Sequence, residues 1–179
     1  MTTWRKMKPN DINAVHKIGN IIHAALPEDQ SIPAERLRLF PDGCLVLASP
    51  STNTEDDNNA AEEEEVIGGY IISHPIKHRQ PPPLNTLLGD IPIDADQFYL
   101  HDVAILPEFR GKGLAAMGIA MALVEADKRF QTTCLVSVYG TAKFWGRFGF
   151  APVEDVGAAL KEKVRGYGED AIFMERRNK

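Results

Sequence analysis

Apolar residues in the first part of the chain recur with the spacing of a helix. Positions three and four apart lie on the same side of a helix. The residues that share such a face are Ile12, Val15, Ile18, Ile22 and Ala25. Pro33 suits a first helical position, so a second short helix is predicted over residues 33–40. Residues 3–7 have the composition of a strand, and we expect them to precede both helices.

Further along, short apolar runs bounded by turn residues predict strands. Residues 44–49 and 66–73 favour a hairpin with a long tip. Other strands are predicted at residues 96–106, 132–138 and 170–176, and helices at about 114–129 and 141–148. The proline-rich residues 78–93 are predicted to form an irregular connection, and the charged residues after 153 receive no element. The mixture of strands and helices, without a repeat or linker, predicts an α/β (α+β) fold.

Composition and charge change this picture in one place. The chain has 179 residues, of which 44% are hydrophobic and 25% charged, as expected for a single domain over residues 1–179. Residues 51–65 hold seven acids and no Lys or Arg, so the net charge of the remainder is −5 + 7 = +2. Such a segment cannot bury enough apolar surface to repay its ordering, so a disordered loop is expected. The nearly neutral remainder predicts no nucleic-acid partner.

The chain lacks signals for membrane insertion, export or metal binding. No apolar run approaches the length that spans a bilayer, and residues 1–7 do not have the parts of a signal peptide. We therefore expect a soluble, cytoplasmic protein with no membrane partner. Cys44 and Cys134 are isolated in apolar surroundings, and no Cys and His residues have the spacing of metal ligands, so buried free thiols and no metal are predicted.

The residues from 108 to 130, EFRGKGLAAMGIAMALVEADKRF, place a glycine-rich turn before a long apolar helix. A P-loop requires Ser or Thr after its lysine, but Gly113 follows Lys112. A dinucleotide site requires an acidic residue at the end of the next strand, and residues 132–138 end without one. What remains is an anion site at a helix start, with charge from Arg110 and Lys112. The alternative is a glycine turn that only packs strand against helix.

Two motifs in this region resemble those of the GNAT superfamily of N-acetyltransferases. RGKGLA, residues 110–115, matches Gln/Arg-x-x-Gly-x-Gly/Ala, and FWGRFGF, residues 144–150, is similar to Phe-Tyr/Trp-x-Arg/Lys-x-Gly-Phe. The resemblance implies the GNAT fold, a mixed, mostly antiparallel sheet of about six or seven strands, splayed between the fourth and fifth, with about four flanking helices. It also implies acetyl-CoA as co-substrate, with no metal.

The same resemblance implies which residues bind acetyl-CoA. The pyrophosphate would lie on the N–H groups of residues 111–116 beside Arg110, and the pantetheine arm along the strand edge at residues 103–105. The aromatic pair of the second motif would pack along that arm. The implied cofactor-binding residues are Val103, Ala104, Ile105, Arg110, Gly111, Lys112, Gly113, Leu114, Ala115, Ala116, Phe144 and Trp145.

The acceptor chemistry points to His101. An alkylamine has a pKa near ~10, so a base must remove its proton before it can attack a thioester. An imidazole with an ordinary pKa of ~6.5 suits that task near neutral pH. Strand alternation places Tyr99, His101 and Val103 on one face and Leu100 and Asp102 on the other. A β-bulge, common in the family, would re-aim this alternation and make Asp102 the acid–base group instead.

The chain departs from the family pattern at the group that reprotonates the leaving thiolate. Trp145 stands where many members have a tyrosine, and Val138 replaces a frequent asparagine. The acid is then Tyr139, Tyr99, water or none, and Tyr99 joins His101 as a candidate catalytic residue.

Short matches suggest a substrate class and the part of the chain that selects it. YLHDVAI at residues 99–105 and FPDGCLVL at residues 40–47 resemble arylalkylamine N-acetyltransferases. Substrate walls are expected from residues 25–33. Glu28 and Asp29 there are interpreted as solvated loop acids, and the alternative is that they attract a cationic amine. His16 and His23 are placed at the surface or a substrate wall, and His74 and His78 beside the proline-rich connection.

The predicted function is transfer of the acetyl group of acetyl-CoA to a small primary amine of arylalkylamine or polyamine type. The alternatives are a protein or peptide N-acetyltransferase and a non-catalytic acetyl-CoA-binding regulatory domain. A monomer or homodimer is expected.

Overall fold

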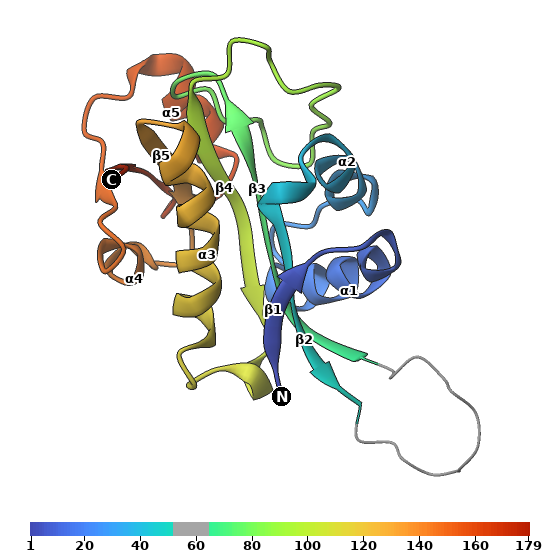
Figure 1. Ribbon diagram of the computed structural model, residues 1–179. Coiled ribbons are helices and arrows are strands. Elements are labelled where there is room, and N and C mark those ends of the chain that lie inside the picture. Colours follow the sequence, from blue (N-terminus) through green and yellow to red (C-terminus); the bar gives the residue numbers. More distant parts are fainter. Residues whose placement is uncertain (52–64) are drawn as a thin grey trace, which may run out of the picture.

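The computed structural model describes residues 1–51 and 65–179. Within them, one seven-stranded sheet has the order β1-β2-β3-β4-β5-β7-β6 (Figure 1). Its strands are β1 (Thr3–Lys6), β2 (Cys44–Pro50), β3 (Glu65–Ile76), β4 (Gln97–Ile105), β5 (Thr132–Ser137), β6 (Ala151–Pro152) and β7 (Ile172–Arg177). Only β4 and β5 pair in parallel, and the other neighbours are antiparallel. The predicted mixed, mostly antiparallel sheet is confirmed.

Helices cover both faces of this sheet. The α-helices of the described residues are α1 (Ile12–Ile22), α2 (Ser31–Leu39), α3 (Leu114–Arg129), α4 (Ala142–Gly146) and α5 (Gly157–Arg165). Short 3-10 helices occur at Pro9–Asp11, Pro41–Gly43 and Pro107–Phe109. The helix α1 buries its apolar face against one side of the sheet, and α3 packs on the other (Figure 1). The predicted face of α1 is correct at Ile12, Val15 and Ile18, which are buried.

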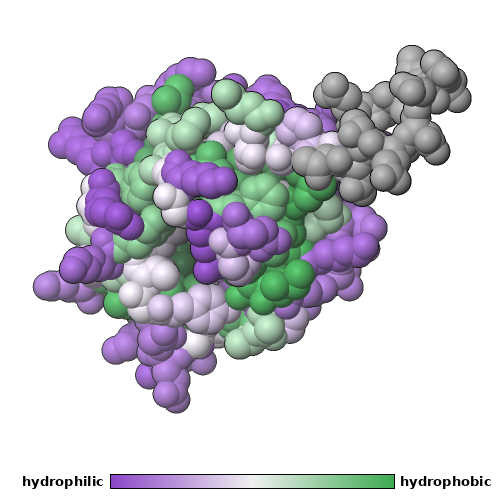
Figure 2. Space-filling model, turned by 90° about the horizontal axis from the view of Figure 1, so that it is seen from below, coloured by the Kyte–Doolittle hydropathy of each residue, from purple (hydrophilic) through white to green (hydrophobic). Residues whose placement is uncertain are grey.

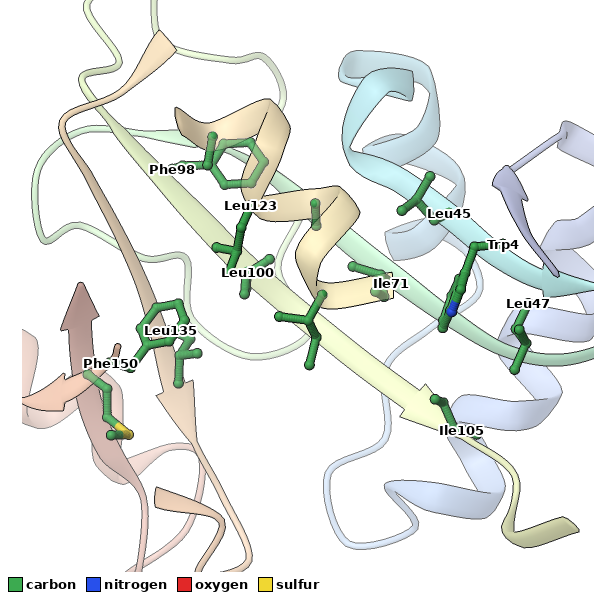
Figure 3. Packing of buried hydrophobic residues seen from close by; sticks show 14 residues of the cluster. Trp4, Leu45, Leu47, Ile71, Phe98, Leu100, Ile105, Leu123, Leu135 and Phe150 are labelled. Atoms are coloured by element: carbon green, nitrogen blue, oxygen red, sulfur yellow. The ribbon is translucent and has the colours of Figure 1, made fainter. Parts of the chain in front are cut away.

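The start of α3 is fixed by a contact with the first strand. The indole Nε1 of Trp4 donates a hydrogen bond of 2.7 Å to the carbonyl of Leu114. A Cβ at Gly118 would lie 2.4 Å from the Trp4 ring, so only glycine allows the helix to approach this closely. Trp4 belongs to the main core cluster with Leu47 and Ile71 (Figure 3). The turn before α3 is therefore held by the core of the sheet.

Two helices differ from the sequence predictions. The helix α2 begins at Ser31, before Pro33, where the Asp29 carboxylate accepts the N–H of Ser31 at 2.9 Å. The helix α5 was missed, because its charged residues hid an apolar spacing of four. Leu160 and Val164 are buried there against Phe173, with Val156 packed beside them.

Three remaining predictions concern single segments or side chains. The predicted disordered loop at residues 51–65 lies, for residues 52–64, outside the described part of the chain. Glu65 itself is the first residue of β3 and forms a 2.6 Å ion pair with Arg5. Cys44 and Cys134 are buried free thiols, as predicted. No helix in the described ranges has both the length and the apolar character needed to cross a membrane.

The strands β4 and β5 pair over a short distance and then separate. Their register contains only Phe98 with Thr133 and Tyr99 with Cys134, although β4 continues to Ile105. Figure 3 shows the two strands close together near Phe98 and well apart toward Ile105. The predicted splay is therefore confirmed, and it leaves one edge of β4 without a neighbouring strand beyond Tyr99.

Candidate functional site

A cavity of about 980 Å³ lies where β4 and β5 separate. Its walls come from residues 100–105 of β4, the turn before α3, the end of β5, and the aromatic residues of α4. The loop between α1 and α2 closes the opposite end with Leu26 and Glu28. Figure 2 views the molecule from the end at which α3 begins and shows hydrophobic surface among hydrophilic groups.

The turn before α3 has the geometry of an anion site. Gly111 has φ 84° and Gly113 φ 73°, left-handed values that glycine adopts without strain. The first helical bond runs from the N–H of Met117 to the carbonyl of Gly113, so the N–H groups just before it have no acceptor within the helix. Arg110 adds positive charge, and its Nε donates to the Ile105 carbonyl at 2.9 Å. Such a helix start attracts a negatively charged group.

The predicted cofactor residues gather around this cavity with one exception. Those that line it are Val103, Ala104, Ile105, Arg110, Gly111, Gly113, Leu114, Ala115, Ala116, Phe144 and Trp145. Lys112 is exposed and does not belong to the lining. The free edge of β4 therefore faces the same cavity as the start of α3.

A β-bulge in β4 overturns the predicted alternation of side chains. Ile72 pairs with Asp102 and Ser73 with Leu100, so His101 is an extra residue in β4. Val103 consequently packs with Leu100 in the core cluster under α3, away from His101. His101 and Asp102 both reach partners on the α1 side of the sheet. The prediction that Val103 shares the face of His101 was wrong, and the bulge considered as its alternative is present.

His101 forms a pair with Glu28 from the loop after α1. Its Nε2 lies 2.8 Å from Oε1 of Glu28, and the other carboxylate oxygen accepts the N–H of Asn85 at 2.9 Å. Burial raises the pKa of Glu28, but the charge and hydrogen bond of His101 outweigh it, so the net pKa is below its ordinary value. The Glu28 side chain is only 17% exposed, so its interpretation as a solvated loop acid was wrong.

Asp102 forms a second pair, with His23 at the end of α1. Oδ1 of Asp102 lies 2.8 Å from Nε2 of His23, close enough for an ion pair although not aligned as a hydrogen bond. The Tyr70 hydroxyl donates to the other carboxylate oxygen. Burial lowers the pKa of His23, but Asp102 outweighs this and the net pKa is raised. Burial likewise raises the pKa of Asp102, and His23 brings it below its ordinary value.

Two tyrosines named as candidate acids occupy different surroundings. Tyr139 lines the cavity, and its ring stacks on His23 with a centroid distance of 5.8 Å. Burial first, and then Asp102, raises the pKa of Tyr139, which keeps its hydroxyl protonated. Tyr99 is fully buried and absent from the cavity lining, with its ring centroid 5.8 Å from that of His101. Of these two tyrosines, only Tyr139 can touch a molecule bound in the cavity.

Three residues of this neighbourhood were not expected as neighbours of His101 and Asp102. Glu28 and His23 come from the end of α1 and the loop after it. The expectation that this region forms a substrate wall was the only indication in the sequence that they lie near the site. His74 was placed beside the proline-rich connection but lies within β3, fully buried, 5.9 Å from His101 between ring centroids. No sequence pattern indicated these pairings. Among the residues described here, no three or more His, Cys, Asp or Glu side chains are placed to hold a metal ion.

The chain is similar to several solved structures. Ard1 from Thermoplasma volcanium has 15% identity and a TM-score of 0.67, with 99% of this chain and 98% of that chain covered. Naa50 from Arabidopsis thaliana, in complex with the bisubstrate analogue CoA-Ac-MVNAL, has 10% identity and a TM-score of 0.62, covering 98% and 97%. The loading GNATL domain of CurA from Lyngbya majuscula has 14% identity and a TM-score of 0.69, covering 99% and 98%. At these identities the likeness shows the fold.

Comparisons of sequence give the family directly. No curated protein matches the chain, and the suggested similarity to arylalkylamine N-acetyltransferases finds no support. The family model described as "Acetyltransferase (GNAT) family" matches residues 20–150, which include both motifs, the bulge and the Glu28–His101 pair. The chain belongs to the GNAT acetyltransferase family.

Proposed function

We propose that this protein transfers the acetyl group of acetyl-CoA directly to the primary amine of a small molecule. The observation that carries the proposal is the cavity of about 980 Å³, which joins the helix start and free strand edge to two carboxylate–imidazole pairs. One end suits an anionic thioester donor and the other suits an amine that must lose a proton. The two ends meet along β4.

The residues at the first end fit acetyl-CoA. The glycine turn brings bare backbone to the cavity, so the N–H groups of residues 111–116 can bind the pyrophosphate, with Arg110 beside them. The unpaired edge of β4 at Val103, Ala104 and Ile105 can accept the pantetheine amides as an added strand. A β4 N–H then polarises the thioester carbonyl as its oxygen becomes negative. Phe144 and Trp145 form the wall along the arm.

The residues at the second end suit proton removal from an ammonium group. Glu28 and Asp102 present carboxylates to the cavity, and the ammonium loses its first proton to the Glu28–His101 pair at the Glu28 carboxylate, which His101 positions through Nε2. The free nitrogen attacks the thioester carbonyl, so a C–N bond forms and the C–S bond breaks. Tyr139 gives its hydroxyl proton to the departing sulfur and regains one from the acetylated nitrogen. Trp145 cannot act in that step, since indole is not an acid in this pH range.

The walls at this end favour an amine with an apolar or aromatic body. Those walls are Ile22, Leu26, Leu84, Tyr139 and Tyr167. Their surface matches an arylalkylamine better than a polyamine, which would need acids along its whole length. A peptide amine is the second candidate, favoured by the fold shared with Naa50, whose structure contains a peptide analogue.

The test is the release of free thiol from acetyl-CoA across a panel of arylalkylamines, polyamines and short peptides. Release with a small amine is expected, and release with peptides alone would assign the second candidate. Thermal stabilisation by CoA but not by NAD or ATP is expected in parallel. Stabilisation without release across the panel would indicate a non-catalytic acetyl-CoA-binding domain, and no stabilisation by CoA would overturn the donor site.

A further inference from the structure

Four buried polar atoms without a hydrogen-bond partner gather behind His101. Within the described residues they are Arg36 Nε, His74 Nε2, the Tyr99 hydroxyl and His101 Nδ1. Buried polar atoms in folded proteins almost always have a partner, either protein or bound water. Four exceptions in one neighbourhood therefore require a common explanation.

The four side chains come from three elements, and the three rings among them lie close together. The ring centroids are 5.5 Å apart for His74 and Tyr99, 5.9 Å for His74 and His101, and 5.8 Å for Tyr99 and His101. Arg36 of α2 is fully buried, and its charge acts on both His74 and Tyr99. Its Nη1 donates a hydrogen bond to Glu35 and its Nη2 donates one to the Thr86 carbonyl at 2.8 Å. The third nitrogen of the guanidinium group, Nε, has no such partner.

The hydrogen-bonding roles of these atoms are fixed by their other contacts. His74 Nδ1 lies 3.1 Å from the Pro75 carbonyl, which only accepts, so Nδ1 carries the hydrogen and Nε2 is an acceptor. His101 Nε2 faces the Glu28 carboxylate, so in the neutral ring Nε2 carries the hydrogen and Nδ1 is an acceptor. Arg36 Nε is a donor, and a tyrosine hydroxyl serves either role. One donor, two acceptors and one hydroxyl match the bonding capacity of buried water.

We propose that Arg36, His74 and Tyr99 bind buried water that holds neutral His101 in the tautomer donating Nε2–H to Glu28. The water accepts from Arg36 and donates to His74 Nε2 and His101 Nδ1, while the Tyr99 hydroxyl completes its bonds. Arg36, His74 and Tyr99 are then positioning residues that act through His101. The catalytic consequence rests on the proposed function, since it requires the Glu28–His101 pair to be the base.

Burial keeps His74 in the role that this arrangement requires. Burial lowers the pKa of His74 to about 3, so this ring stays a neutral acceptor. The charged or titratable groups that face His101 are Glu28 from the α1–α2 loop, Asp102 and Tyr99 from β4, and His74 from β3. Arg36 from α2 and Tyr167 after α5 act on Tyr99. The Tyr167 hydroxyl donates to the Pro82 carbonyl at 2.8 Å, and its oxygen lies close enough to the Tyr99 hydroxyl to accept from it.

The direct test is the tautomer of His101, read from the ¹⁵N chemical shifts of its ring. The His101→Gln spectrum identifies its signals. In the wild-type protein a single Nε2–H tautomer is expected, and His74→Leu and Tyr99→Phe should each lose that single state. Ser73→Ala, which removes a buried β3 hydroxyl that donates to the Gly43 carbonyl at 2.8 Å, is the control and should leave the tautomer unchanged. If His74→Leu does not fold, Tyr99→Phe alone decides.

A mixed or Nδ1–H tautomer in the wild type, or an unchanged tautomer in both variants, would overturn the proposal. A crystal structure that shows ordered water should place it within hydrogen-bond distance of at least three of the four atoms, and none there would equally contradict it. In turnover, His74→Leu is expected to lower kcat/KM about tenfold at unchanged KM for acetyl-CoA. The tautomer is measured without an acceptor amine, so its result is independent of the outcome of the thiol-release panel.

Discussion

The two ends of the cavity are built in different ways. The donor end consists of backbone, since its glycine turn, helix start and free strand edge come from two neighbouring stretches of chain. The acceptor end consists of side chains from distant segments, and Glu28 and His101 are 73 positions apart. Binding at the donor end depends on the backbone conformation of the turn, whereas chemistry at the acceptor end depends on the pairing of carboxylate and imidazole side chains. Substitutions should therefore damage the two ends through different kinetic constants.

The largest expected effect at the donor end comes from Gly113→Val. A β-branched residue at φ 73° is strained by about 1–2 kcal/mol and places methyl groups where the anion is expected. We expect CoA affinity to fall about 100-fold, which corresponds to about 2.7 kcal/mol. The measurement is thermal shift against CoA concentration. Gly146→Ala in α4, where a Cβ meets nothing within 4 Å, is the control and should bind CoA normally.

A comparable loss at the acceptor end should appear in turnover alone. Glu28→Gln removes the charge that faces His101 and is expected to lower kcat/KM about 100-fold, the range of general-base contributions. Stabilisation by CoA should not change, because Glu28 lies away from the turn before α3. Asp29→Asn, on the adjacent exposed residue, should have little effect on either quantity. Loss of CoA binding in Glu28→Gln would show that the two ends are not separable.

A smaller effect concerns the stability supplied by His23 and Asp102. The pKa of His23 is raised in the folded state, so its contribution is full below the unfolded pKa of ~6.5 and is lost as pH rises through the raised value. The pKa of Asp102 is lowered, so its contribution is full above ~3.9 and is lost as pH falls through the lowered value. His23→Gln should therefore cost most, about 1 kcal/mol, between these limits.

Denaturant unfolding of wild type and His23→Gln over a pH series measures this difference. It should be greatest near pH 5 to 6 and decline above pH ~6.5. The exposed His78→Gln provides the same change without the pair and should show no such pH dependence. A difference that stayed constant across the series would contradict the charge pair.

The smallest expected effects distinguish the two cations of the donor turn. Both side chains are exposed, but Arg110 lines the cavity and is held to the Ile105 carbonyl, whereas Lys112 lies outside the lining. We expect Arg110→Ala to raise the KM for acetyl-CoA about fourfold and Lys112→Ala by less than about twofold, since exposed charges contribute little. Steady-state kinetics at two salt concentrations provide the measurement. Equal effects would mean that the turn binds through charge alone.

The contrast between the two ends also explains what the sequence could predict. The donor turn was predictable because glycine spacing and a helix start are local properties, and Gly111 and Gly113 do lie in a turn directly before α3. The position of Lys112 outside the cavity lining could not be predicted, because the direction of its side chain depends on the geometry of the turn. His101 was named from residue type and strand position, but its partner was not, since 73 positions separate them. The burial of His74 depends on the packing of α2 and β4 around it, which no periodicity reports.

The most direct test of the central claim, that the Glu28–His101 pair takes the proton of the acceptor amine, is the pH dependence of kcat/KM. The best amine from the thiol-release panel serves as substrate. For the wild type we predict a limb that rises with pH as the pair loses its proton, and in His101→Gln a much lower rate without that limb. An unchanged profile in His101→Gln would contradict the account.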